Sequence, residues 1–426
     1  MDEFLFLTPD IFTVPNLDKA KLDAFLKYEV TSLVMPALPT GITHLVFIHN
    51  KEVASTVHLK IVLDLQALLY GSATIDLFKP TSENTINLCY AYTEAILTMF
   101  PSLADLTLNI DRYLINDIMA TNTSLEALPY LILAKVCRID YSLNLLVDEA
   151  DKELSLRLIK SSYYDTKKKV QNYKKNGDGE KNYNLYAKSS AKKASSATKV
   201  YDKLRYYDDK NIAITDTMRQ QAENILRYEY EKSNDLRQFV ANNYDLPKSF
   251  LKSPYLLSPV TFFDYDTCYK ILLAVYAKEI GLEDWYADYQ YKKAVNDSQL
   301  TAHKKKTILN DIAPLISQCR SVESASSAYV KGYTLAKTRK KIKGSACTFK
   351  SYLTEIHSVG IQPLRIPDKA KRTHLSNPIN MIQHNRQIFN RNFNIPAHIK
   401  ANIDRLLQHI WLNELSRKCG QIQKAS

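Results

Sequence analysis

The chain lacks the short motifs that mark several large enzyme classes. It has no Walker A loop, no Gly-x-Gly-x-x-Gly fingerprint and no Gly-x-Ser-x-Gly elbow, so nucleotide-driven motors and α/β-hydrolases are not indicated. Its six cysteines are far apart, form no Cys-x-x-Cys pair and have no zinc-type spacing with the nine histidines. We therefore expect reduced thiols and no structural zinc.

Long apolar runs are also missing. No run reaches the roughly 18 residues that cross a membrane, and the start Met1-Asp2-Glu3-Phe4 lacks the basic region of a secretory signal. We expect a protein of a bacterial host cytoplasm with no membrane partner. Glycine and tryptophan are scarce, with 9 and 2 residues, whereas tyrosine occurs 28 times.

The composition that remains indicates a folded, basic protein. The 426 residues are enough for roughly two to three domains, and 45% hydrophobic residues can form a sizeable core. A formal charge of +12 favours a polyanionic partner. Tyrosines next to lysines suit nucleic acids, because aromatic rings stack on unpaired bases and ammonium groups follow the backbone. Tyrosine is equally typical of strands and half-buried surfaces.

Three short stretches alternate in character as strands do: Val136 to Leu143, Thr198 to Leu204 and Ile225 to Glu231. Successive side chains of a strand point to opposite faces, so alternate residues share a face and lie about 7 Å apart. The pairs are Arg138 with Asp140, Tyr201 with Lys203, and Arg227 with Glu229. We expect a phenol, cations and two carboxylates on one sheet surface. A sheet with one wet face gives the same alternation without any function.

Elsewhere the sequence predicts a β-hairpin and several helices. The runs Ile42 to Ile48 and Val57 to Leu63 are strand candidates around the turn Asn50-Lys51-Glu52. Helical spacing or composition predicts helices over residues 85–100, 114–134, 149–160, 215–224, 269–280, 299–316 and 325–343.

Two basic segments follow different patterns. Residues 163–195 are rich in Lys, Asn, Ser and Gly and predict a solvated loop, with gripping of a nucleic-acid strand as the alternative. The run Lys337 to Lys343 precedes Ser345, a helix cap, and a helix that Gly360 ends. A basic run before a short capped helix resembles a small DNA-binding module. A solvated helix end gives the same pattern.

These landmarks, in this order and at similar spacing, resemble a known family. Arg138-Ile139-Asp140, Tyr201-Asp202-Lys203 and Leu226-Arg227-Tyr228-Glu229 are similar to three strands of the replication initiators of filamentous bacteriophages, the gene II protein and its plasmid relatives. The segment from Phe349 to Ile361 is similar to a helix and Gly-Ile turn near the family's C-terminus. The likeness spans about residues 59 to 366.

The resemblance implies an α+β fold. Residues 1–253 would form an antiparallel-sheet nicking endonuclease domain related to the His-hydrophobic-His (HUH) class, and residues 254–426 a mainly helical DNA-binding region. It implies a rolling-circle initiator whose nucleophile is Tyr201, assisted by Lys203. The product is a covalent 5′-phosphotyrosine and a free 3′ hydroxyl. The implied partners are double-stranded origin DNA, the nicked single strand, and a host helicase and polymerase.

The chemistry of these side chains is consistent with that role. A tyrosine hydroxyl has a pKa of about 10 and attacks at neutral pH only if a base or a positive charge assists it. Lys203 supplies that charge if it shares a strand face with Tyr201. Tyr186 also has a lysine two residues on and remains a competing nucleophile. Tyr206 and Tyr207 are interpreted as packing or stacking residues.

The chain departs from the family at the metal site. Where the family has a Gly-His-Asn motif, this chain has Gly71-Ser72-Ala73, and it has no His-hydrophobic-His pair. A Mg²⁺ or Mn²⁺ ion, which accepts carboxylate ligands, would have to rest on Asp140 and Glu229, with His58 or Asp64 as further candidates.

We expect phosphate contacts from basic residues on these strands and in the later basic run, namely Arg138, Arg227, Lys199, Lys337, Arg339, Lys340, Lys341 and Lys343. Two other classes stay open. One is a non-catalytic DNA-binding protein on the same scaffold. The other is a structural or RNA-binding protein that uses its tyrosines for stacking.

Overall fold

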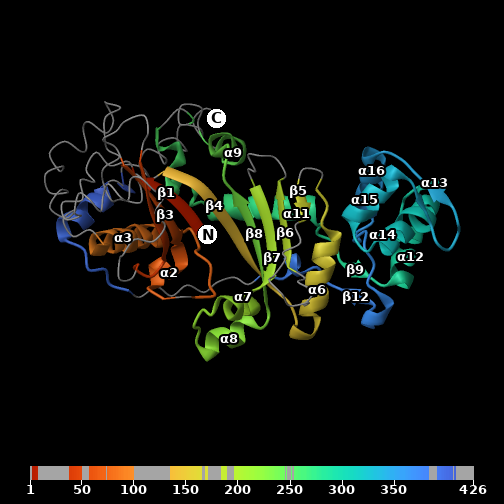
Figure 1. Cartoon of the computed structure of the whole chain (residues 1–426), viewed down its shortest axis with the longest axis horizontal. Coiled ribbons are helices and arrows are strands. Elements are labelled where there is room, and N and C mark those ends of the chain that lie inside the picture. The colour runs from red at the N-terminus through yellow and green to blue at the C-terminus, as the bar shows by residue number, and fades with distance from the viewer. Residues whose placement is uncertain are drawn as a thin grey trace, which may run out of the picture. The chain divides into compact units, whose positions relative to one another are not determined.

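The fold is taken from a computed structural model of the whole chain (Figure 1). The structure describes residues 2–7, 38–49, 57–72, 74–99, 135–165, 168–170, 184–189, 196–244, 246, 251, 254–382, 391–405 and 407–408. The chain divides into two units, described separately below. Unit 1 comprises Met1–Tyr141, Glu231–Lys270 and Asn385–Ser426, and unit 2 comprises Ser142–Tyr230 and Ile271–His384. Each unit takes residues from both sides of residue 253, so this division differs from the one expected from the sequence.

Unit 1 contains an antiparallel sheet. Its strands are β1 (Asp2–Leu7), β2 (Ile42–His49), β3 (Val57–Asp64) and the first part of β4 (Lys135–Leu146), in the order β2-β3-β1-β4. The predicted hairpin is confirmed, since β2 and β3 pair antiparallel with Phe47 opposite Leu59. Its turn lies outside the described residues. Gly41 (φ +90°) is required, because a Cβ there would lie 2.3 Å from the Leu68 backbone.

Helices complete unit 1. They are α2 (Leu65–Tyr70), α3 (Ser82–Met99), α9 (Leu236–Asn243), the 3-10 turn η4 (Pro254–Leu257), α10 (Pro259–Phe262), the start of α11 (Tyr265–Glu279) and a helix over residues 397–405. The helix predicted over residues 85–100 is confirmed as α3, in which Leu88, Ala91 and Ile96 are at most 1% exposed. The helix predicted over residues 114–134 lies outside the described residues.

Unit 2 is built on a second set of strands. The last residues of β4 are followed across the sheet by β8 (Ile225–Lys232), β7 (Ser196–Asp202), β6 (Leu185–Ser189) and β5 (Lys168–Val170). The pairs β5–β6 and β6–β7 are antiparallel. The two faces differ in chemistry because side chains alternate along each strand. Helix α11 lies behind β8, β7 and β6 in Figure 1 and covers one of the two faces that these strands form.

The covered face holds a buried polar cluster. Lys168 Nζ lies 2.6 Å from Glu279 Oε1 of α11 and 3.0 Å from Thr198 Oγ1 of β7, and the Thr198 hydroxyl donates to Glu279 Oε2 at 2.7 Å. The ring of Tyr228 packs against Tyr276 of α11, with centroids 5.1 Å apart. Thr198 and Tyr228 therefore point to the α11 side. Their neighbours Lys199 and Glu229 point to the other side.

The remaining helices of unit 2 are α6 (Glu149–Ser162), α7 (Lys203–Lys210), α8 (Asp216–Ala222), α12 (Asp288–Asp297), α13 (Ala302–Thr307), the π turn η5 (Ile308–Ile312), α14 (Ala313–Cys319), α15 (Val322–Lys331) and α16 (Ala346–Ser358). Short elements are β9 (Trp285–Tyr286), paired with β12 (His374–Leu375), and the 3-10 turns η6 (Asp368–Ala370) and η7 (Pro378–Asn380). Most predicted helices after residue 148 are confirmed. Ser345 caps α16 as expected, and Phe349, Leu353 and Ile356 are buried.

The helix predicted over residues 325–343 is wrong beyond Lys331. Helix α15 ends at Lys331, and the chain then forms a small antiparallel hairpin of β10 (Tyr333–Thr334) and β11 (Lys341–Ile342). Gly332 follows the helix at φ +90°, which a helix cannot include. The segment also buries only two apolar side chains, those of Leu335 and Ile342, and these are seven residues apart and do not form the continuous apolar face of a helix.

Both units combine antiparallel strands with helices, so the α+β prediction is confirmed at this level. None of the helices in the described residues has the length and apolar character that crossing a membrane requires. The described cysteines, Cys89, Cys137, Cys268, Cys319 and Cys347, are free thiols.

Candidate functional site

The face of the unit 2 strands opposite α11 brings together four of the predicted residues. Lys199 and Tyr201 come from β7, and Arg227 and Glu229 come from β8. The Tyr201 hydroxyl donates a hydrogen bond of 2.5 Å to Glu229 Oε1. Lys199 Nζ lies 3.5 Å from Glu229 Oε2. We call these four residues the Tyr201 face.

Glu229 is the electrostatic centre of this face. It is only 7% exposed. Burial raises the pKa of its carboxyl, but the charges of Lys199 and Arg227 and the hydrogen bond from Tyr201 outweigh burial and hold the pKa below its ordinary value. At neutral pH the group is therefore a carboxylate. A carboxylate at hydrogen-bond distance from a phenol is positioned to take its proton.

Arg227 is held in place rather than exposed. It is 6% exposed, and its Nε donates a 2.7 Å hydrogen bond to Oδ1 of Asn144, a fully buried residue of β4. Its role as a phosphate contact stays a prediction, and only a phosphate close to Glu229 would come near this buried side chain. Asn144 was not predicted. It continues the alternation Arg138, Asp140, Ser142 along one strand, a signal that the sequence does carry.

Lys203 does not share a strand face with Tyr201, and that prediction is wrong. The strand ends at Asp202, whose side chain accepts hydrogen bonds from the backbone N–H groups of Leu204 (3.0 Å) and Arg205 (3.3 Å). Asp202 is therefore the N-cap of α7, and Lys203 is the first helical residue. The charge of Lys203 still contributes to lowering the pKa of Glu229. The lysine thus acts on the base from the helix.

An ion pair fixes the start of α7. Lys152 Nζ of α6 lies 2.6 Å from Asp202 Oδ1 and donates to the backbone oxygen of Ala222 at 3.2 Å. Neither role was predicted. An Asp directly before a short polar helix is a typical cap signal. Here the alternating pattern of the preceding strand extends through Lys203, so the sequence predicts that the strand continues past Asp202.

The competing tyrosine also lies on this side of the sheet. Tyr186 of β6 stands opposite Lys199 in the antiparallel register, and it is partly exposed. Side chains directly opposite each other on paired strands point to the same face. A nucleophile needs a base within hydrogen-bond reach, and the bond from Tyr201 to Glu229 meets that requirement.

The predicted metal ligands already have partners. Asp140 lies in unit 1, where Arg138 Nε and Nη2 bind its two oxygens at 3.0 and 2.8 Å. Both oxygens of Glu229 contact Tyr201 or Lys199. Asp64 caps α2 by accepting from Ala67 N at 3.0 Å. In the described part of the chain no three His, Cys, Asp or Glu side chains form a metal-binding group. The residues present do not fit a preformed metal site.

The second basic site is the hairpin over residues 333–343, here called the basic hairpin. Leu335 and Ile342 are buried and anchor it. Lys340 Nζ binds both carboxylate oxygens of Asp311, at 2.7 and 2.6 Å, and Asp311 is placed by the π turn η5. The remaining cations, Lys337, Arg339, Lys341 and Lys343, are exposed, and none of them forms an ion pair with any residue that the structure describes.

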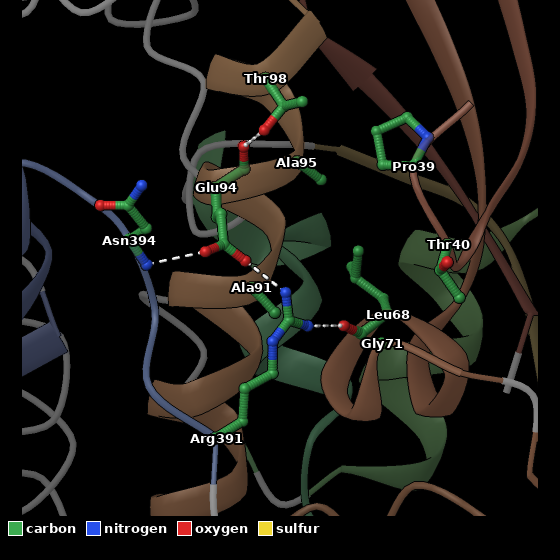
Figure 2. A pocket seen from close by; sticks show the side chains of 10 residues that line it. All are labelled: Pro39, Thr40, Leu68, Gly71, Ala91, Glu94, Ala95, Thr98, Arg391 and Asn394. Carbon is green, nitrogen blue, oxygen red and sulfur yellow. Dashed lines mark hydrogen bonds and ion pairs between the residues drawn. The ribbon is translucent and has the colours of Figure 1, made fainter. Parts of the chain in front are cut away.

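Unit 1 contains a cavity of about 300 Å³ between α2, α3 and residues 391–394 (Figure 2). Its polar groups bind one another. Arg391 forms an ion pair with Glu94 and donates to the Leu68 oxygen at 3.0 Å, and the Asn394 N–H donates to Glu94 at 2.7 Å. A ligand that bound to Arg391, Glu94 or the Asn394 N–H in this cavity would have to replace these contacts.

Comparisons of the chain with protein-family models, with curated proteins and with solved structures give no match.

Proposed function

We propose that this chain nicks and rejoins one strand of origin DNA through a covalent bond to Tyr201, as a rolling-circle replication initiator does. The observation that carries the proposal is the 2.5 Å hydrogen bond from Tyr201 to the buried Glu229 carboxylate, next to Lys199 and Arg227. This arrangement unites a nucleophile, a base and positive charge. These are the parts that in-line attack on a phosphodiester requires.

The proposed attack uses Glu229 as a general base. A phenol is a much weaker acid than a carboxylic acid, so the proton moves to Glu229 as the oxygen–phosphorus bond forms and not beforehand. The bond between phosphorus and the 3′ oxygen breaks. The 3′ oxygen receives the proton from Glu229, and the 5′ phosphate stays on Tyr201. Rejoining is the reverse of these steps and needs no ATP.

Positive charge stabilises the transition state in this scheme. Lys199 and Arg227 lie beside Glu229, and Lys203 adds its charge from the first turn of α7. In the proposed mechanism these three charges offset the growing negative charge on the phosphate. A Mg²⁺ or Mn²⁺ ion, if bound, would supply the same kind of stabilisation. The chain's own residues carry every step proposed here.

The basic hairpin supports the binding part of the proposal. Its four exposed cations lack acidic partners among the described residues, so they are available to phosphates of duplex origin DNA. A host helicase and polymerase would then use the nicked strand and its 3′ hydroxyl. The same hairpin also favours a second candidate function, a non-catalytic DNA-binding protein, because its contacts do not depend on Tyr201.

The test follows nicking of supercoiled circular DNA that carries the gene for this chain and its flanking sequence. Wild type, Tyr201→Phe and the matched control Tyr186→Phe are incubated with Mg²⁺ or Mn²⁺ and stopped with detergent. We expect open circles with covalently attached protein from wild type and Tyr186→Phe only. Nicking by Tyr201→Phe would overturn the nucleophile assignment. DNA binding by all three without any nicking would favour the non-catalytic function.

A further inference from the structure

An exposed aromatic ring lies next to the proposed nucleophile. Tyr206, in the first turns of α7, is 37% exposed. Its ring centroid is 5.2 Å from that of Tyr201, with the two planes inclined by 42°. The neighbouring ring of Tyr207 is 6.1 Å from Tyr206 and only 4% exposed. Tyr207 is thus a packing residue, whereas Tyr206 presents ring surface to solvent.

A buried cation supports this ring. Lys203 Nζ lies 4.9 Å from the centre of the Tyr206 ring and 4.6 Å from that of Tyr207. Lys203 itself is 8% exposed. The Lys203 ammonium therefore contacts two rings of α7, and its charge also helps to lower the pKa of Glu229. The attraction between a cation and an aromatic ring stabilises this arrangement of Lys203 and the two rings.

The helix that carries Tyr206 is fixed at both ends. Asp202 caps its first turn and binds Lys152, and Asn211 ends it in a left-handed conformation at φ +52°. A platform fixed in this way loses little conformational freedom when a ligand binds. The ring is therefore prepared for a flat partner before that partner arrives.

We propose that Tyr206 is a positioning residue that stacks on the base of the nucleotide next to the phosphate attacked by Tyr201. The inference deepens the proposed function and rests on it. A base in duplex DNA is already stacked on both sides, so the ligand is an unpaired nucleotide. Every base has an aromatic face, which makes such stacking tolerant of sequence. Tyr206 then holds the strand while Glu229 and Tyr201 act on its phosphate.

The test measures binding to a single-stranded oligothymidylate that contains one 2-aminopurine, and to a duplex of the same sequence. The variants are Tyr206→Leu, which keeps an apolar side chain, and Tyr206→Trp, which keeps an aromatic one. The control is Tyr289→Ala, at a 75% exposed tyrosine on α12. Circular dichroism and thermal midpoints establish that each variant folds.

We expect Tyr206→Leu to weaken single-strand binding about 5- to 150-fold, from the usual contribution of one stacked base, and to abolish the quenching of 2-aminopurine. Tyr206→Trp should retain both, Tyr289→Ala should match wild type, and duplex binding should not change. Equal affinity and quenching for Tyr206→Leu and wild type would overturn the stacking inference, whether or not the protein nicks. Quenching by a protein that forms no covalent adduct with the supercoiled DNA of the nicking test would overturn the proposed function and leave the stacking site standing.

Discussion

Unit 2 carries two groups of basic residues that differ in what surrounds them. On the Tyr201 face, Lys199 contacts Glu229, and the buried Arg227 is held by Asn144. On the basic hairpin, Lys337, Arg339, Lys341 and Lys343 are exposed, with no ion pair to any described residue. The cations of the Tyr201 face act on their neighbours: their charges lower the pKa of Glu229, and Arg227 binds the side chain of Asn144. Exposed cations without partners instead supply affinity for polyanions, which salt weakens.

The largest effect that separates the two groups is expected from Glu229→Gln. The amide cannot accept the proton of Tyr201, so nicking should fall about 10²- to 10⁴-fold, the usual contribution of a general base. Affinity for DNA should not fall, because the basic hairpin is untouched. Rates from single-turnover nicking and affinities from fluorescence anisotropy check both parts. The control is Glu149→Gln, at an exposed residue of α6. A Glu229→Gln protein that nicks at the wild-type rate would remove Glu229 from the mechanism.

Asp202→Ala should affect the Tyr201 face next most strongly. It removes the cap of α7 and leaves Lys152 without its carboxylate, so we expect a loss of about 1 to 3 kcal/mol in the free energy of unfolding. Thr215→Ala is the matched control, because Thr215 caps α8 through Met218 without an ion pair. Its loss should be about 1 kcal/mol. Urea denaturation measures both, and equal losses would mean that the ion pair with Lys152 contributes nothing.

The double variant Lys341→Gln, Lys343→Gln tests the basic hairpin. If each lysine contacts one phosphate, the slope of log affinity against log salt should become shallower by about 2, since each contact contributes about 0.9. Lys293→Gln with Lys306→Gln is the matched control, because it removes the same charge from exposed residues of α12 and α13. Arg339 is left unchanged, since its backbone is left-handed at φ +54°. The same slope for both double variants would mean that the hairpin has no special role in binding.

The smallest expected effect is the dependence of stability on pH. The pKa of Glu229 is lowered in the folded protein, so between the folded and unfolded values the unfolded state binds more protons. This contribution to stability is complete above a pH of about 4.3 and is lost as the pH falls through the folded value. Its slope is at most about 1.4 kcal/mol per pH unit. Urea titrations from neutral to acidic pH should find this slope reduced in Glu229→Gln and unchanged in the hairpin double variant.

Local pattern was sufficient for some parts of this molecule. The alternation of β8 placed Arg227 and Glu229 on one face, and Ser345 with its apolar stripe located α16. Local pattern failed where two signals competed. Asp202 continues the alternation of β7 and is also a good helix cap, and in the folded chain the cap prevails and moves Lys203 into α7.

Other features depend on residues far apart in the sequence. Asn144 meets Arg227 across 83 residues, and Lys340 meets Asp311 across 29. No periodicity within a segment encodes such pairs. The hairpin after Lys331 was missed for a related reason. Its lysines suit a helix surface, whereas its conformation depends on Gly332 and on burial of Leu335 and Ile342 against the rest of unit 2.

The buried cluster of Lys168, Thr198 and Glu279 has a consequence for how β7 finds its place. A slip of β7 by one residue would turn every side chain to the opposite face. Lys199 would then point toward α11, and Lys168 and Glu279 would lose the hydroxyl that joins them. The cluster therefore favours the observed register of β7 over one shifted by a residue. Because side chains alternate along the strand, Thr198 on the α11 side places Tyr201, three residues later, on the opposite side with Glu229.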